Sequence, residues 1–329
     1  MGVALRRLGR TGLAVSEIGF GCGTTADLMI HGTPEMRRQA VARALELGIN
    51  YFDTAPVYGE TASESHLGQA LRELGARPIV ATKVALVDDD LEDICGAVVG
   101  SVEASLGRLG LDTLPLIQLH NRVGARRAAK GEFGTGALLT VADVLGPRGV
   151  VEGFLALRKR GLVHHFGCSA YGGEVTAIQQ LVDSGAFDAI IVNYSVLNRT
   201  AWQAAGSPAR VRDYGGIARR ASAAGMGAIA LRVLEGGVLA GTESATRRGP
   251  DLEAMTAQAR ALRTSLAPGD PPMTELAIRF ALSNREVSTV LIGFSDIAQI
   301  DEAVRCAAAG PLPADLLQRV DRPVTIGIG

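Results

Sequence analysis

Short apolar runs alternate with amphipathic helical patterns along most of this chain. Eight of the runs have the length of buried strands, and each is followed by a segment with helical spacing of its apolar residues. This alternation predicts parallel strands joined by helices. Because eight such units close a (β/α)8 barrel, and the 329 residues fit one barrel with long loops, we expect a single barrel domain over residues 1–329.

The pattern also places the individual elements. We expect strands at residues 18–21, 51–53, 79–82, 116–119, 165–168, 189–192, 227–231 and 289–292. We expect helices at residues 34–47, 64–74, 91–109, 150–160, 174–183, 211–223, 274–282 and 297–308. Two short alternating runs within residues 4–15 predict an N-terminal β-hairpin that closes the bottom of the barrel. Three long connections, at residues 121–149, 198–210 and 236–273, follow strands and should rise over the catalytic face.

Charge and cysteine content narrow the classes of function. The formal net charge is −1 and the basic residues are dispersed, so we expect neither nucleic acid nor a membrane as a partner. No segment reaches the roughly 18 apolar residues of a membrane span, and no signal-peptide pattern follows Met1. The four cysteines lack metal-ligand spacing, so we expect no metal site and reduced thiols in a cytoplasmic protein. Homo-oligomerisation stays open.

Four side chains that can handle protons follow three successive predicted strands. Asp53 ends one strand, Tyr58 lies five residues later in a loop with proline and glycine, and Lys83 and His120 end the next two apolar runs. In a parallel barrel these strand ends meet at the face where active sites are built. An ammonium beside a tyrosine lowers the pKa of the phenol, and a carboxylate beside the lysine keeps it charged. A neutral imidazole can orient a carbonyl oxygen.

Each of these residues alone has an ordinary explanation, such as a surface loop, a solvated charge, a turn or a rim position. The occurrence of all four in this order, each at the end of a strand or in the loop after it, is far more specific evidence for a catalytic site than any one of them alone. Residues 48–59 (GINYFDTAPVYG) and 63–68 (SESHLG), with the later lysine and histidine, resemble the aldo-keto reductase superfamily. Residues 8–13 (LGRTGL) resemble its branch of bacterial sugar dehydrogenases and channel β-subunits. The resemblance implies a catalytic tetrad of Asp53, Tyr58, Lys83 and His120.

The resemblance extends to the predicted cofactor, NADP or NAD. Residues 161–169 (GLVHHFGCS) are similar to the family's fifth strand, where a serine and an asparagine hold the nicotinamide carboxamide. Ser169 is retained, whereas Ala170 replaces the asparagine. In the sixth strand Ile191 replaces a glutamine, so Asn193 is expected to supply an amide group. In the seventh strand Leu231 takes the place of an aromatic residue that stacks on the nicotinamide.

The rest of the cofactor is expected to meet backbone turns. Gly236 and Gly237 would approach the pyrophosphate, and the turn before the last helix would bind phosphate, because helix N-termini present free N–H groups. A tight surface turn and an ordinary capped helix are the structural alternatives. The predicted cofactor contacts are Gly21, Cys22, Asp53, Ser169, Asn193, Leu231, Gly236, Gly237, Gly293, Ser295 and Gln299.

Taken with the resemblance, these residues predict an NAD(P)(H)-dependent oxidoreductase that acts on aldehydes, ketones or sugar hemiacetals, with Tyr58 as the general acid–base group. Val57, His120 and Trp202 are expected to contact the small carbonyl or alcohol substrate. One alternative is a nicotinamide-binding regulatory subunit whose turnover is incidental. Another is a phosphate-handling barrel isomerase or lyase.

The turn before the last predicted helix bears on the choice between NADP and NAD. No lysine or arginine stands between Gly293 and Glu302, and Asp296 directly follows Ser295. A 2′-phosphate there would lose a charge-assisted partner and meet a carboxylate. We therefore expect weak preference for NADP, or use of NAD.

Overall fold

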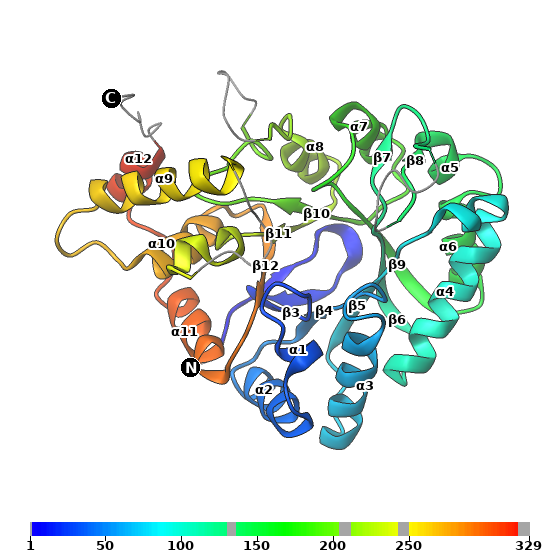
Figure 1. The fold of residues 1–329 in the computed structure, drawn as a ribbon, viewed down its shortest axis with the longest axis horizontal. Helices are drawn as coiled ribbons and strands as arrows, with labels where there is room; N and C mark the ends of the chain where they lie inside the picture. Colours follow the sequence, from blue (N-terminus) through cyan, green and yellow to red (C-terminus); the bar gives the residue numbers. More distant parts are fainter. Residues whose placement is uncertain (1, 130–135, 204–211, 243–249, 322–329) are drawn as a thin grey trace.

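Among the residues that the structure describes, eight parallel strands close into a barrel at the centre of the molecule (Figure 1). The structure is a computed structural model that describes residues 2–129, 136–203, 212–242 and 250–321. The barrel strands are β3 (Ile18–Gly21), β4 (Tyr51–Asp53), β5 (Ile79–Val84), β6 (Leu114–Leu119), β9 (Val163–Ser169), β10 (Ala189–Asn193), β11 (Gly227–Leu231) and β12 (Val287–Gly293). β12 pairs in parallel with β3 and so closes the sheet. The predicted (β/α)8 barrel is confirmed.

Helices surround the barrel and cover its outer face (Figure 1). Those that connect successive barrel strands are α2 (Pro34–Glu46), α3 (Ala62–Leu74), α4 (Ile94–Leu109), α6 (Val150–Lys159), α7 (Val175–Asp183), α8 (Ile217–Ala223) and α10 (Met273–Ser283), and α11 (Ile297–Ala308) follows the last strand. Their ends follow the sequence signals. The Thr33 side chain caps α2 by accepting from the Met36 N–H at 3.2 Å, and Gly110 ends α4 in a left-handed conformation.

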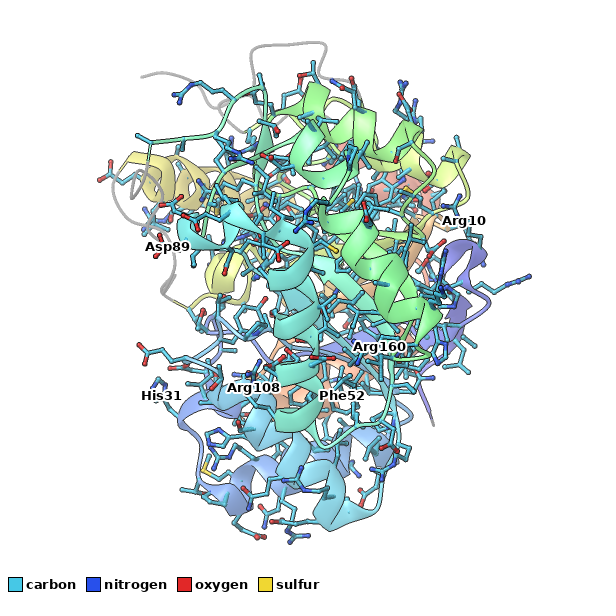
Figure 2. The ribbon with its side chains drawn as sticks, turned by 90° about the vertical axis from the view of Figure 1, so that its right-hand side faces the viewer. Arg10, His31, Phe52, Asp89, Arg108 and Arg160 are labelled. Carbon is cyan, nitrogen blue, oxygen red and sulfur yellow. The ribbon has the colours of Figure 1, made fainter. Side chains whose placement is uncertain are left out.

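The N-terminal hairpin closes the barrel at the N-terminal ends of the strands, as predicted. Its strands β1 (Leu5–Arg7) and β2 (Ala14–Ser16) pair antiparallel, and η1 (Gly9–Thr11) lies between them. Leu8 is fully buried in the cluster that fills the barrel interior. Arg10, labelled in Figure 2, donates to Asp188 Oδ1 at 3.0 Å and to the carbonyl oxygen of Gly185 at 2.8 Å. The hairpin is thus fixed to the segment that leads into β10.

The largest difference between a predicted and an observed helix start is at α8, and α4 also begins three residues late, at Ile94. The helix expected at residues 211–223 is α8, which starts only at Ile217. Gly215 and Gly216 precede it with φ values of 59° and 68°, in the left-handed region that an α-helix cannot include. Residue 211 lies outside the described part of the chain.

The long connections contain secondary structure that the sequence did not predict. Residues 121–149 hold β7 (Val123–Gly124), β8 (Leu139–Thr140) and α5 (Val141–Leu145), and residues 236–273 include part of η3 (Glu235–Ala240) and α9 (Pro250–Ser265). The remaining elements are α1 (Leu28–His31), η2 (Asp88–Glu92) and the C-terminal α12 (Ala314–Asp321). Residues of the connections 121–149 and 236–273 line the cavity described below, as expected. The described residues of the third connection, 198–203, do not line it.

Within the described ranges, no helix has the length and apolar character needed to cross a membrane. The same residues contain no cluster of three or more metal-ligating side chains, and all four cysteines are free. That the chain forms one domain stays a prediction.

Candidate functional site

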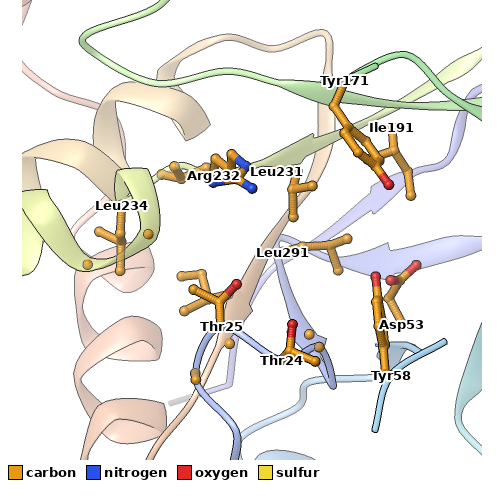
Figure 3. Close-up of a pocket in the computed structure, with 18 of the residues that line it drawn as sticks. Thr24, Thr25, Asp53, Tyr58, Tyr171, Ile191, Leu231, Arg232, Leu234 and Leu291 are labelled. Atoms are coloured by element: carbon orange, nitrogen blue, oxygen red, sulfur yellow. The ribbon is translucent and has the colours of Figure 1, made fainter. Parts of the chain in front are cut away.

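A cavity of about 980 Å³ opens at the C-terminal ends of the barrel strands (Figure 3). Its walls include residues at or just beyond the ends of strands throughout the barrel, together with residues of the long connections, α10 and α11. The four residues predicted to handle protons, Asp53, Tyr58, Lys83 and His120, all line it. The alternation of strands and helices therefore brings together side chains that lie up to 67 positions apart in the sequence, as a parallel barrel requires.

Lys83 connects the carboxylate of the site to its phenol. Its Nζ donates to Asp53 Oδ1 and, at 2.8 Å, to the Thr54 carbonyl oxygen. The same Nζ lies 4.8 Å from the centroid of the Tyr58 ring. Asp53 ends β4 and Lys83 lies in the neighbouring strand β5, so two rigid strands fix the ion pair. Tyr58 follows in the loop after β4, with its ring in the cavity wall.

For both Lys83 and Tyr58, burial and the charge of a neighbouring residue shift the pKa in opposite directions. Burial lowers the pKa of Lys83, but the adjacent Asp53 charge outweighs it and raises that pKa above its ordinary value. Burial raises the pKa of Tyr58, and the charge of the nearby Lys83 ammonium acts against that rise. The net pKa of Tyr58 is raised, so without ligand the phenol is protonated at neutral pH and the lysine is charged.

His120 completes the cluster as a neutral imidazole. Its ring packs edge-on against Tyr58, with 5.8 Å between the ring centroids. Burial, and then repulsion from Lys83, lower the pKa of His120 to about 3. A neutral imidazole can hydrogen-bond a carbonyl oxygen without adding a second positive charge to the site.

Among the polar residues of the site that were not singled out from the sequence, three lie close to the tetrad or at strand ends. Tyr171 follows β9 in the cavity wall, 6.0 Å from the His120 ring, and burial raises the pKa of its phenol to about 12. Arg232 lines the cavity just after β11, with a φ of 58° (Figure 3). Gln118, in β6, donates from Nε2 to Asp53 Oδ2 at 2.9 Å. Tyr171 and Arg232 share the signal that marked the tetrad, because Arg232 directly follows a predicted strand and Tyr171 lies three residues beyond the end of another.

The predicted carboxamide contacts carry polar atoms that the protein leaves unpaired. Ser169 pairs with Ile191 across β9 and β10, so Asn193 lies on the same face two residues further along. Both side chains are buried, and among the described residues neither Ser169 Oγ nor Asn193 Oδ1 has a hydrogen-bond partner. Asn193 Nδ2 is held by the Tyr214 hydroxyl at 2.7 Å. A carboxamide offers donors and an acceptor that match these atoms, but neither Ser169 nor Asn193 is among the residues that line the cavity.

The far end of the cavity has the backbone shape expected for phosphate. Gly236 and Gly237 line it with φ values of 69° and 104°, where a larger residue would be strained. Gly293, Ser295 and Gln299 line the cavity at the start of α11. Asp296 is the N-cap residue, because its Oδ1 accepts from the Gln299 N–H at 3.0 Å.

The remaining predicted residues divide into two groups. Gly21, Val57 and Leu231 line the cavity. Cys22 lies behind it, fully buried, and its N–H donates to the Asp53 carbonyl oxygen at 2.9 Å. The structure does not bring Trp202 to the site: its Nε1 donates to Glu286 Oε2 at 2.6 Å, and its ring packs on Tyr194. We therefore remove Trp202 from the expected substrate contacts.

The fold and the position of the site are those of a (β/α)8-barrel enzyme. The profile of the Aldo/keto reductase family matches residues 17–324, and the chain belongs to this family of oxidoreductases, whose members typically use NAD(P)H. Its relatives include L-galactose dehydrogenase of Arabidopsis thaliana, 27% identical over 314 residues that cover 92% of this chain and 87% of the relative.

Two further comparisons agree. A putative voltage-gated potassium channel subunit beta of Schizosaccharomyces pombe is 34% identical over 126 residues, which cover 36% of each chain. The holo form of an aldo-keto reductase from Bacillus halodurans superposes with a TM-score of 0.72 at 26% identity, and the alignment covers 97% of this chain and 95% of the other. The predicted family is confirmed, together with similarity to sugar dehydrogenases and a channel subunit.

Proposed function

We propose that this protein transfers a hydride between NAD(P)(H) and an aldehyde, a ketone or a sugar hemiacetal. The observation that carries the proposal is the buried cluster in which Lys83 contacts both Asp53 and Tyr58 beside a neutral His120. Each member has the protonation state that carbonyl reduction needs. The phenol holds a proton to donate, the lysine is charged, and the imidazole is neutral.

In reduction, Tyr58 Oη donates its proton to the carbonyl oxygen as negative charge develops there. The Lys83 ammonium stabilises the phenolate that remains, and Asp53 keeps that ammonium in place. His120 hydrogen-bonds the same carbonyl oxygen and orients it within the cavity. In oxidation the residues act in reverse, and Tyr58 accepts the proton of the alcohol.

The cofactor supplies or accepts the hydride when it is bound. We propose that Ser169 and Asn193 hold its carboxamide, because both leave a buried polar atom unpaired among the described residues. Gly236 and Gly237 would approach the pyrophosphate, and Leu231 would pack on the nicotinamide. Gly293, Ser295 and Gln299 are proposed for the adenosine end, and Gly21 for the ribose near the nicotinamide. Cys22 would act only through the backbone.

We propose a small, polar carbonyl compound as the substrate. The substrate end of the cavity includes Val57, His120 and Tyr171, which offer an apolar surface and two hydrogen-bonding groups. A sugar is one such compound, and the name of L-galactose dehydrogenase, which matches most of this chain, supports that class.

The test has two measurements. NADH and NADPH are titrated into the protein by fluorescence, and a panel of aldehydes, ketones and aldoses is followed at the nicotinamide absorbance in both directions. Binding with many turnovers per site is the expected result. Binding with only a single slow turnover would instead support a regulatory subunit. If neither NADH nor NADPH binds, the proposal is contradicted, and a barrel enzyme that does not use nicotinamide is favoured.

A further inference from the structure

Gln118 lies in barrel strand β6 and hydrogen-bonds the carboxylate of the Asp53–Lys83 ion pair. Its side chain is fully buried, and Nε2 donates to Asp53 Oδ2 at 2.9 Å. The other oxygen of that carboxylate, Oδ1, accepts from Lys83 Nζ. Two donors from different strands therefore hold the two oxygens of Asp53, and together they fix the plane of the carboxylate.

The orientation of the Gln118 amide is dictated by this contact. With Nε2 directed at Asp53, the amide oxygen Oε1 has no hydrogen-bond partner among the described residues. An unpaired buried acceptor costs free energy. Turning the amide over would place Oε1 against a carboxylate oxygen, with two acceptors facing each other. The protein thus leaves one polar atom unpaired in order to keep the donor on Asp53.

The neighbouring strands leave room for this side chain. In the sheet register Gln118 stands between Lys83 of β5 and Gly167 of β9. A Cβ atom at Gly167 would lie 2.9 Å from Gln118 Cγ, closer than side chains pack. Gly167 therefore permits the position that Gln118 needs to reach Asp53.

We infer that Gln118 is a positioning residue of the site: its amide holds Asp53 in the orientation that fixes Lys83 beside Tyr58. The inference rests on the proposed function, because it assigns Gln118 a part in the same proton transfer. Without the amide, Asp53 Oδ2 is a buried carboxylate oxygen without its donor. The carboxylate then turns, Lys83 is held less firmly, and the phenolate of Tyr58 loses stabilisation.

Two substitutions of similar length separate the hydrogen bond from packing. Gln118→Met removes the donor, and we expect kcat to fall by about ten- to a hundredfold, the scale of one hydrogen bond to a charged group, with cofactor affinity unchanged. Gln118→Glu behaves differently with pH. When the introduced carboxyl group is protonated, its O–H donates to Asp53 as the amide does; when it is ionised, it repels Asp53. We expect activity near that of wild type at low pH and a new ionisation that abolishes it as pH rises.

A second readout does not depend on turnover. The chain has five tyrosines, so 13C labelling of the tyrosine ring carbon that bears oxygen gives five signals, and Tyr58→Phe assigns the one from Tyr58. The pKa of Tyr58 should rise in Gln118→Met and in Gly167→Ala, which crowds Gln118. Thr289→Val is the matched control. It removes a fully buried hydroxyl that has no partner among the described residues, and it should leave the pKa of Tyr58 unchanged.

The outcomes distinguish the inference from the proposed function. An unchanged pKa of Tyr58 in both Gln118→Met and Gly167→Ala would overturn the inference, and so would a Gln118→Glu pH profile identical to that of wild type. If wild type itself reduces no carbonyl compound, the proposed function fails, yet the titration of Tyr58 still decides whether Gln118 acts on the site. Should Gln118→Met fail to fold, Gln118→Glu and Gly167→Ala supply the same tests.

Discussion

Lys83 and Asp53 form an ion pair inside the barrel, with only 2% and 4% of their side chains exposed. Removing one partner of such a pair leaves an uncompensated buried charge, which is strongly unfavourable. Neither residue lies in a flexible loop, because β5 carries the lysine and β4 ends at the aspartate. The ion pair is therefore in place before any ligand binds. Of the four tetrad residues that line the cavity, only Tyr58 and His120 lie in loops.

Replacing Tyr58 with phenylalanine should abolish turnover and leave cofactor affinity nearly intact. The phenol donates the proton, and its loss should cost roughly 10²–10⁴-fold in rate. Steady-state kinetics and a fluorescence titration of the cofactor measure the two effects. Tyr171→Phe removes the second phenol of the described cavity wall and should cost much less. A Tyr58→Phe rate above about a tenth of wild type, with chemistry limiting, would contradict the assignment.

Lys83→Met should remove most activity and raise the apparent pKa of any residual oxidation rate. The ammonium opposes the rise that burial causes in the pKa of Tyr58, so without it the phenolate forms only at higher pH. The pH dependence of alcohol oxidation checks this. Full activity with an unchanged pH profile would remove Lys83 from the mechanism.

His120 should stay neutral throughout the working range of pH. Its pKa is lowered from 6.5 to about 3, so the folded protein leaves the ring uncharged where the unfolded chain takes up a proton. Unfolding therefore binds a proton between these values, and this residue weakens stability as pH falls from about 6.5 towards 3. Histidine NMR should show no titration of His120 near pH 6.5, and His120→Gln should unfold less readily in acid. A His120 signal that titrates normally would contradict both.

The tetrad could be predicted because its members occur in local motifs at strand ends, and the alternation of elements fixes which ends meet. Gln118 could not, because its partner Asp53 lies 65 residues earlier, and only the barrel register shows that their side chains meet. The position of Trp202 in a loop favours a substrate contact. In the structure its indole N–H instead donates to Glu286, a tertiary contact between residues 84 positions apart that the local sequence pattern does not predict.

Glu64 should contribute to stability rather than to chemistry. Its carboxylate is fully buried and accepts from Thr82 Oγ1 at 2.5 Å and from Arg108 Nε at 2.6 Å, so it joins α3, β5 and α4 (Arg108 is labelled in Figure 2). Glu64→Ala should lower the free energy of unfolding by about 3–5 kcal/mol. Denaturant unfolding measures it. Glu103→Ala, which breaks the exposed pair with Arg160, should cost less than about 1 kcal/mol, and equal losses would contradict this account.

The start of α11 leads us to expect weak NADP preference or use of NAD. The Asp296 carboxylate already caps the helix, and the Ser295 N–H donates to Gln299 Oε1 at 2.9 Å. Glu302 lines the cavity nearby, whereas Arg305 is 75% exposed, 4.0 Å from that carboxylate, and outside the cavity wall. Arg247, a loop arginine that could also reach in, lies outside the described residues. A 2′-phosphate would therefore meet negative charge without a described cation beside it.

Steady-state kinetics with NADH and NADPH test this expectation directly. Glu302→Lys should improve kcat/KM for NADPH relative to NADH, because charge-assisted hydrogen bonds to phosphate are strong. Glu103→Lys makes the same change in net charge on α4, outside the cavity lining, and should leave the ratio unchanged. If wild type prefers NADPH by about a hundredfold, a cation outside this turn binds the phosphate, and the interpretation of the turn is wrong.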